Sequence, residues 1–381
     1  MSLPTIPNVN RRRVLGGLAA LPFMDASHVL AKAPESPLYL SALSDDDEGH
    51  FGVIFEETGE MRARIELPAR GHGGAFSPMA AEVVIFARRP GTFAVVFEPR
   101  SGRIIASLAS PEGRHFFGHG IYSRDGRLLY TTENDYETGD GIIGIWDAAH
   151  GYRRVGEFPS YGIDPHDIRL MPDGHTLAIA NGGILTHPDY GRRKLNIPEM
   201  SPSLVLADAR DGKLVREVKL PAELHKLSIR HMAVNKAGQI GVAMQYEGQE
   251  TDLPPLVFIW RGGEPQLLDA PEPILRQMTN YCGSAALDAA GEVLGITSPR
   301  GGLASFWAMA DGRLLGTAAM VDTCGIASAG RHSFILSSGD GSRRIEKLVK
   351  RAGHSGPELP EHVQLPRLEG HWDNHLVRGS I

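Results

Sequence analysis

Short hydrophobic runs alternate along this chain with turns that are rich in Gly and Asp. One unit reads as strand, Asp/Gly turn, strand, loop, strand, Gly turn and strand, and residues 120–158 form a clear copy of it. Runs of β-branched and aromatic residues bounded by such turns are typical of antiparallel strands. The pattern therefore predicts an all-β protein built from four-stranded meanders.

The four-stranded unit repeats along the chain, with inner strands that begin near residues 73, 120, 167, 232, 283 and 325. Residues 38–67 supply three more strands without an inner strand before them, and residues 371–377 supply one strand with nothing after it. Pairing the two ends removes the exposed sheet edges that an open array would leave. Repeats of this kind indicate a β-propeller. We expect seven blades of four antiparallel strands, with the ring closed by pairing the C-terminal strand with the N-terminal strands.

Composition narrows the classes of function. Hydrophobic residues make up 42% of the 381 residues, and 45 Gly with 26 Pro disfavour a mostly helical protein. The 39 basic residues are outnumbered by 45 acidic ones, so the chain has no basic footprint for nucleic acid. Two cysteines exclude a disulfide framework, whereas 16 histidines are many. The position of these histidines becomes the central question.

The N-terminus has the anatomy of an export signal. Arg11, Arg12 and Arg13 precede an apolar stretch over residues 14–24, which is too short to span a bilayer, and Ala31-Lys32-Ala33 follows it. Paired arginines before such a stretch resemble a twin-arginine signal. We expect a cleaved signal over residues 1–33, a single propeller domain over residues 34–381, and a periplasmic protein without a transmembrane span. The alternative is a basic, poorly ordered N-terminus.

A histidine or a cysteine opens each predicted inner strand. Because inner strands line the central channel of a propeller, equivalent positions should form a ring at one mouth. Imidazole and thiolate bind transition metals, so the ring predicts a site for iron or copper. The alternatives are a polar channel lining and a disulfide between the two cysteines, which would leave a ring of histidines. The ring residues are His72, His119, His166, His231, Cys282, Cys324 and, in the closing blade, His371 or His375.

Polar residues gather in loops that should lie on the same face as this ring. Carboxylates and amides one layer outside a histidine ring can orient the imidazoles, although Asn, Asp and Gly are also simple turn formers. The loop over residues 181–203 carries a basic run, Arg192-Arg193-Lys194. This run is a candidate binding site for an anionic ligand, although such runs are more often solvated. The candidate outer residues are Glu133, Asn134, Asp135, Asn181, His187, Arg230, Gln245, Arg300 and Asp322.

Seven segments of the chain carry a resemblance to a known family: Gly118-His119-Gly120, Tyr130-Thr131-Thr132-Glu133-Asn134-Asp135, Pro165-His166-Asp167, Ala180-Asn181-Gly182-Gly183-Ile184, Thr186-His187-Pro188-Asp189, Leu227-Ser228-Ile229-Arg230-His231 and Trp372-Asp373-Asn374-His375. They resemble a bacterial family of twin-arginine-exported seven-bladed propellers of unknown function, encoded beside imelysin-type iron-uptake proteins and a dihaem-peroxidase-like oxidoreductase. The resemblance implies a periplasmic role connected with iron and partners from a metal-uptake system, but no established activity.

Three functions fit the sequence. The first is a periplasmic metal-binding protein that acts in metal uptake, delivery or metal-linked redox chemistry. The second is a metal-dependent hydrolase or lactonase with His119 or His166 as acid/base and Glu133 assisting; propeller hydrolases that hold calcium use carboxylates, and the imidazole and thiol ring disfavours them. The third is a metal-free interaction scaffold, which needs no ring of ligand-type residues.

Overall fold

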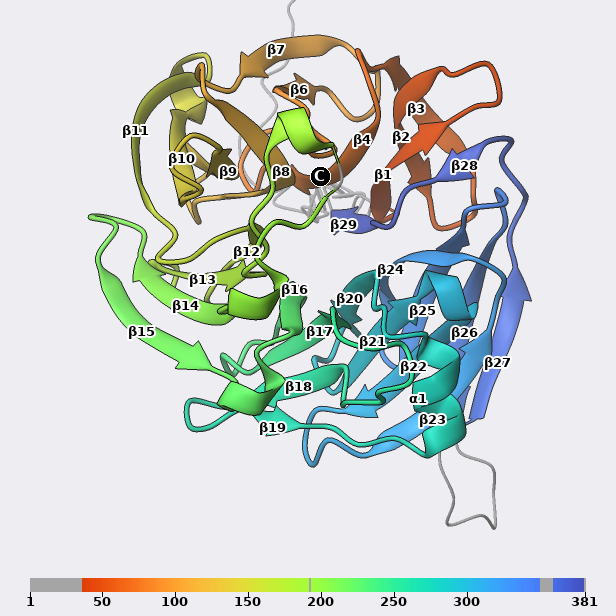
Figure 1. The fold of residues 1–381 in the computed structure, drawn as a ribbon. Coiled ribbons are helices and arrows are strands. Elements are labelled where there is room, and N and C mark those ends of the chain that lie inside the picture. Colours follow the sequence, from red (N-terminus) through yellow and green to blue (C-terminus); the bar gives the residue numbers. More distant parts are fainter. Residues whose placement is uncertain (1–35, 192, 350–358, 380–381) are drawn as a thin grey trace, which may run out of the picture. The chain divides into compact units, whose positions relative to one another are not determined.

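A computed structural model describes residues 36–191, 193–349 and 359–379. The strands in these ranges form seven antiparallel sheets, which surround a common axis as the blades of a β-propeller (Figure 1). The seven blades of four strands predicted from the repeat are confirmed. The predicted export signal, residues 1–33, lies outside the described residues.

The closing blade joins both ends of the chain. Its first strand pairs with two short C-terminal strands, in the register Leu43 opposite Trp372 and Leu40 opposite Val377. This pairing confirms the predicted closure, with one difference: the inner strand is divided by residues 373–376. Blade I comprises β1 (Leu38–Ser44), β2 (His50–Glu56), β3 (Met61–Glu66), β28 (His371–Trp372) and β29 (Val377–Gly379).

The other six blades are continuous in sequence, and each runs from an inner strand to an outer one. Blade II holds β4 (Gly71–Phe76), β5 (Val83–Ala87), β6 (Phe93–Phe97) and β7 (Ile104–Ala109). Blade III holds β8 (Arg114–Tyr122), β9 (Leu128–Asp135), β10 (Gly141–Asp147) and β11 (Arg153–Pro159). Blade IV holds β12 (Pro165–Leu170), β13 (Thr176–Asn181), β14 (Ser203–Asp208) and β15 (Leu214–Lys219).

The described residues hold one α-helix, α1 (Glu272–Met278), which lies between blades V and VI in sequence and is too short to cross a membrane. Blade V holds β16 (Leu227–Val234), β17 (Ile240–Tyr246), β18 (Val257–Trp260) and β19 (Gln266–Leu267). Blade VI holds β20 (Ser284–Leu287), β21 (Val293–Ser298), β22 (Leu303–Ala308) and β23 (Leu314–Ala319). Blade VII holds β24 (Thr323–Gly330), β25 (Ser333–Ser338), β26 (Arg343–Val349) and β27 (Leu359–Gln364).

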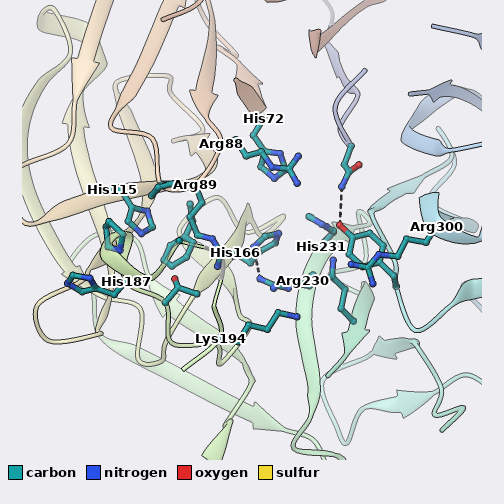
Figure 2. Close-up of a pocket in the computed structure, with 18 residues that line it drawn as sticks. His72, Arg88, Arg89, His115, His166, His187, Lys194, Arg230, His231 and Arg300 are labelled. Atoms are coloured by element: carbon teal, nitrogen blue, oxygen red, sulfur yellow. Dashed lines mark hydrogen bonds between the residues drawn. The ribbon is translucent and has the colours of Figure 1, made fainter. Parts of the chain in front are cut away.

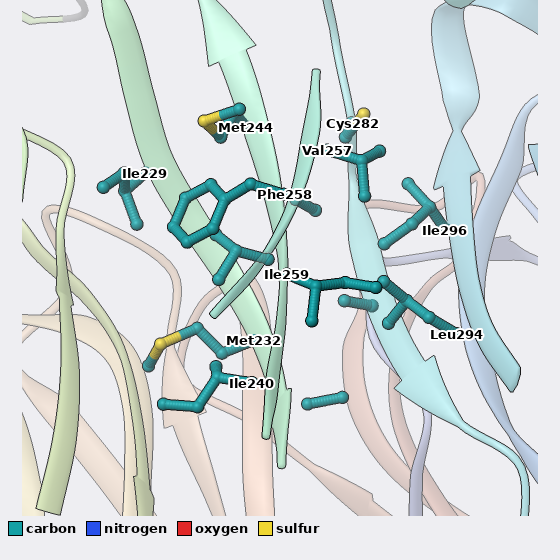
Figure 3. Packing of buried hydrophobic residues seen from close by; sticks show 14 of the residues in the cluster. Ile229, Met232, Ile240, Met244, Val257, Phe258, Ile259, Cys282, Leu294 and Ile296 are labelled. Carbon is teal, nitrogen blue, oxygen red and sulfur yellow. The ribbon is translucent and has the colours of Figure 1, made fainter. Parts of the chain in front are cut away.

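The hydrophobic core lies between neighbouring blades. Middle strands such as β5 are buried along their whole length, because a blade covers each of their faces, and they therefore consist of continuous apolar residues. Outer strands are more exposed: β15 buries only Val218, and its other side chains, three of which are charged, are exposed. Figure 3 shows Ile259 of blade V beside Leu294 of blade VI, within one cluster of buried residues. Burial between blades therefore holds the ring together.

Irregularities in the inner strands mark one level of the channel. The pairing of β4, β8, β12, β16 and β24 with the next strand shifts register at the predicted ring position or, in β16, directly before it. In blade I the gap between β28 and β29 falls at the same place. A β-bulge bends the strand and re-aims a side chain, and bulges are common next to functional sites. Six blades thus leave regular pairing where the ring residues lie.

Closing the ring depends on Trp372, and its removal tests this. The indole is buried, packs edge-on against Phe55 at 5.3 Å between ring centroids, and has Arg343 5.4 Å from its own centroid. We expect Trp372→Ala to lower the free energy of unfolding by ~3–5 kcal/mol, which urea denaturation would measure. The exposed Val215→Ala in β15 should change it by less than ~0.5 kcal/mol. Equal losses in both variants would contradict this role.

Candidate metal centre

Five imidazoles from five blades meet between the inner strands. The ring centroids of neighbouring members lie 4.4–6.2 Å apart, and all five side chains are largely buried. The structure thus brings together five residues of the predicted ring. We call this group the imidazole cluster; its members are His72 (β4), His119 (β8), His166 (β12), His231 (β16) and His375 (between β28 and β29).

Two glycines allow the imidazoles to pack this closely. Gly118 has a φ of +100°, and a Cβ on it would stand 2.6 Å from Cδ2 of His72. A Cβ on Gly73 would stand 2.8 Å from Nδ1 of His119. The imidazoles of His72 and His119 therefore lie directly against the backbone of the neighbouring blade. Any side chain larger than hydrogen at these glycines would displace them.

An aspartate orients one member of the cluster. His72 donates a hydrogen bond from Nδ1 to Oδ1 of Asp373 at 2.6 Å, while Arg70 and Arg88 each donate to Oδ2 at 2.8 Å. Burial would raise the pKa of Asp373, but His72 and the two arginines hold it well below its ordinary value. The ionised carboxylate keeps the proton of His72 on Nδ1 and leaves Nε2 with a free electron pair. This arrangement is the carboxylate–histidine support found behind metal ligands.

Several imidazole nitrogens have no conventional partner. His119 is 4% exposed and His231 is 2% exposed, yet Nε2 of the first and Nδ1 of the second have no hydrogen-bond partner among the described residues. Burial lowers the pKa of His119, His231 and His375 well below the ordinary value, so the rings are neutral and each offers one electron pair. An unpaired buried polar atom costs about 1–3 kcal/mol. A metal ion bound by these electron pairs would remove that cost.

His166 differs from the other four histidines. Its Nδ1 lies 2.9 Å from Nη1 of Arg230, and because a guanidinium only donates, Nδ1 must accept. Burial lowers the pKa of His166 well below its ordinary value, so the proton of the neutral ring is on Nε2. The ring is therefore arranged as a hydrogen-bond donor, and the other four are better placed as metal ligands.

The geometry of the cluster fits a metal ion. Nε2 of His72 and Nε2 of His375 are 3.2 Å apart. Two nitrogens bound to one tetrahedral ion at ~2.0–2.1 Å stand about 3.3–3.4 Å apart. His119, His231 and His375 form a group whose potential ligand atoms lie within 4.8 Å of one another, as do His72, Asp373 and His375. The buried groupings could therefore hold a metal ion.

The remaining ring candidates lie outside the cluster. Cys282 is packed among apolar side chains beside Val257 and Ile296, and burial raises the pKa of its thiol to about 12 (Figure 3). Cys324 lies 3.6 Å from Oδ1 of Asp322, and burial also raises its pKa. Both are free thiols rather than a disulfide, and in the described chain neither belongs to a group of three potential ligands.

In the closing blade the structure distinguishes the two candidate histidines. The side chain of His371 is 61% exposed and hydrogen-bonds to Asp46 and to the carbonyl of Gly339. His375 is buried and faces His72. Of the two, His375 is the one that the structure places in the imidazole cluster.

A pocket of about 370 Å³ adjoins the cluster, and His72, His166 and His231 lie in its wall (Figure 2). Four of the predicted outer residues also line it: His187, Arg230, Gln245 and Arg300. Asn134 stands one layer behind, where its side chain bonds Nε2 of the lining residue His115 at 3.1 Å. The loop predicted to cover this face contributes Thr186 and Lys194.

Besides Asn134, the other four predicted outer residues are not among those that line the pocket. Glu133 is buried in blade III, where its carboxylate accepts from Thr131 and Arg154, each at 2.7 Å. It does not belong to a histidine-containing ligand group among the residues described, and the hydrolase arrangement gains no support. Asp135 accepts backbone hydrogen bonds in a turn, and the amide of Asn181 donates to the carbonyl of Ser160 and to Ser203. Asp322 lies beside Cys324.

Three important residues were not predicted, although the sequence contained a signal for each. Asp373 stands two positions before His375, in a segment that carries the family resemblance. Arg88 and Arg89 line the pocket, and they follow the second strand of blade II just as the predicted loop residues follow the second strands of other blades. Applying the repeat to blade II would have found these two.

Comparison with known families identifies the chain's relatives. A family described as a protein of unknown function (DUF1513) matches residues 65–379. The chain belongs to this family. The DUF1513 match includes all five members of the imidazole cluster and the closing strands β28 and β29.

A solved structure shares the fold. Hydrazine synthase of Kuenenia stuttgartiensis matches with a TM-score of 0.61 at 15% identity, over 83% of this chain and 96% of that one. At this identity the likeness shows the propeller fold of the DUF1513 chain and nothing of its chemistry. None of the curated protein sequences matches this chain.

A glycine substitution tests the close packing of the cluster. Gly118→Ala places a Cβ against His72 and forces a positive φ on alanine, so we expect the free energy of unfolding to fall by about 1–3 kcal/mol in urea denaturation. Gly156→Ala is the matched control, because its Cβ would meet only Ile145 at 3.6 Å. If the two variants unfold at the same urea concentration, the packing described for Gly118 is incorrect.

Proposed function

We propose that this protein binds one transition-metal ion at the imidazole cluster and serves metal uptake, delivery or metal-linked redox chemistry. His119, His231 and His375 would hold the ion, with Nε2 of His72 as a fourth ligand supported by Asp373. The observation that carries the proposal is the pair of buried, unpartnered nitrogens in His119 and His231. A metal-free scaffold gives no reason to bury neutral imidazoles without partners.

We propose iron as the first candidate metal and copper as the second. Imidazole nitrogen suits both, whereas calcium and magnesium require oxygen ligands. The resemblance to a family encoded beside iron-uptake proteins favours iron. The two cysteines are left out of the proposed ligand set, because Cys282 lies in the apolar core and burial raises the pKa of both thiols.

The proposed location is the periplasm, and the proposed partners are periplasmic or membrane components of a metal-uptake system. The location rests on the arginines and the short apolar stretch within residues 1–33, which resemble a twin-arginine signal, and the partners rest on the family resemblance. Twin-arginine export carries folded proteins, so a metal could be installed before export.

Elemental analysis tests metal binding directly. The protein purified from periplasm should contain about one iron or copper per chain, and His119→Ala combined with His375→Ala should abolish this, because two of the three core ligands are lost. The control is His150→Ala combined with His175→Ala, which removes two exposed imidazoles. Wild-type protein without metal under both reducing and oxidising conditions would rule the proposal out.

Asp373 provides a second test. Asp373→Asn removes the charge that holds the proton of His72 on Nδ1, so we expect metal affinity to fall ~10–100-fold in competition with a chelator. Asp147→Asn is the matched control, since Asp147 pairs with His150 at 3.0 Å on the surface. Unchanged metal affinity in the Asp373 variant would show that Asp373 does not support His72 as a ligand.

A further inference from the structure

The pocket beside the imidazole cluster is strongly cationic. Five of its eighteen lining residues are Arg or Lys, and no Asp or Glu is among the described residues that line it. The whole chain has a formal net charge of −6, so the positive charge of this wall is opposite in sign to the charge of the chain. The five cations are Arg88, Arg89, Lys194, Arg230 and Arg300.

The carboxylates that balance some of these cations lie behind the wall. Asp164 and Asp373 are 0% and 2% exposed and contact the guanidinium groups from inside the protein. In Arg230 a single nitrogen, Nη1, bonds both Asp164 at 2.7 Å and His166 at 2.9 Å. The Nε of Arg230 has no hydrogen-bond partner in the described part of the chain, although the residue is only 4% exposed. Arg230 therefore lines the pocket with one of its donors unpaired among the described residues.

Two further groups on the wall are left without polar partners. The hydroxyl of Thr186 is buried and has no hydrogen-bond partner among residues that the structure describes. Arg300 forms no salt bridge with any described residue and lies over the ring of Tyr281, 4.2 Å from its centroid. Stacking on an aromatic ring fixes a guanidinium in place and leaves its donors free for an anion. His166, with its proton on Nε2, adds a neutral donor.

The cations stand on different sides of the pocket. Arg88 follows β5, Arg230 belongs to β16, Arg300 follows β21, and Lys194 comes from the loop between β13 and β14 (Figure 2). A monovalent anion could contact only part of this wall. An anion with two or more charged groups can reach several sides at once, and each guanidinium can bind a carboxylate or phosphate group in bidentate fashion.

We propose that this pocket binds a small multivalent anion whose charged groups are carboxylates or phosphates. The wall supplies Arg88, Arg230, Arg300 and Lys194 as cationic donors, with Thr186 and His166 as neutral ones. The inference goes beyond metal binding and does not depend on it, because none of these six residues belongs to the proposed ligand set.

Calorimetric titration of the metal-free mature chain tests this. The metal is removed with a neutral chelator, because an anionic one would compete for the pocket. Citrate and pyrophosphate represent the two ligand chemistries, and acetate is the monovalent control. We expect citrate or pyrophosphate to bind at one site per chain at least ~30-fold more tightly than acetate, with affinity that falls as salt rises. The tighter of the two identifies the chemistry.

Substitutions locate the site. Arg300→Gln and Lys194→Gln should each weaken binding about 10-fold; Arg300 lacks a salt bridge, and the salt bridge of Lys194 with Glu247 lies in a loop, so neither change threatens the fold. Arg216→Gln is the matched control, because Arg216 also lies over an aromatic ring, that of Trp260 at 5.6 Å, but does not line the pocket. Its affinity should equal that of the wild type.

The two proposals fail separately. His119→Ala with His375→Ala should lose metal and keep anion binding, whereas Arg300→Gln should bind metal normally in acetate buffer. No saturable binding of citrate or pyrophosphate by the metal-free wild type, or equal binding by wild type and both pocket variants, would overturn the anion site.

Discussion

The structure depends on the pairing of β1 with the strands at the far end of the chain. Each blade has apolar faces that only a neighbour can cover, and seven blades cover one another completely only when the ring closes. The register of Leu43 with Trp372 and of Leu40 with Val377 makes that closure. The same short segment carries Asp373 and His375 between its two strands. Closure therefore places the fifth imidazole and its supporting carboxylate at the cluster.

Burial of five imidazoles in one channel carries a cost that hydrogen bonds among the described residues offset only in part. The rings are desolvated, which favours their neutral forms, and His119 and His231 each keep a nitrogen without a partner. Hydrogen bonds satisfy Nδ1 of His166, which accepts from Arg230, and Nδ1 of His72, which donates to Asp373. Nε2 of His375 lies 3.2 Å from Nε2 of His72 and its Nδ1 lies 3.4 Å from Oγ of Ser284, so the unpartnered nitrogens are those of His119 and His231. A transition metal would satisfy these two nitrogens, whereas a hydrolase centred on Glu133 or a metal-free scaffold would leave them unpartnered.

The number of blades could be predicted well from the sequence. Every middle strand is buried between two neighbouring blades, so the same apolar pattern recurs in each blade. The ring could be predicted for the same reason, since equivalent positions of the inner strands lie at one level of the central channel. The finer predictions depended on side-chain direction at the β-bulges, which spacing does not encode. Cys282 occupies the ring position in sequence but lies in the apolar core, and His371 and His375 differ by four positions yet lie respectively on the surface and in the cluster. The sequence places Asp373 two positions before His375, but it does not show the contact of Asp373 with His72, which is 301 positions away.

The central claim is that imidazole nitrogens, without thiolate, form the metal centre. X-ray absorption spectroscopy at the metal edge of the natively loaded protein measures this directly. A metal held by the imidazole cluster should show three or four nitrogen neighbours at ~2 Å with the outer-shell scattering of imidazole rings. A sulfur neighbour at ~2.3 Å, or a shell of oxygen atoms without imidazole scattering, would contradict it.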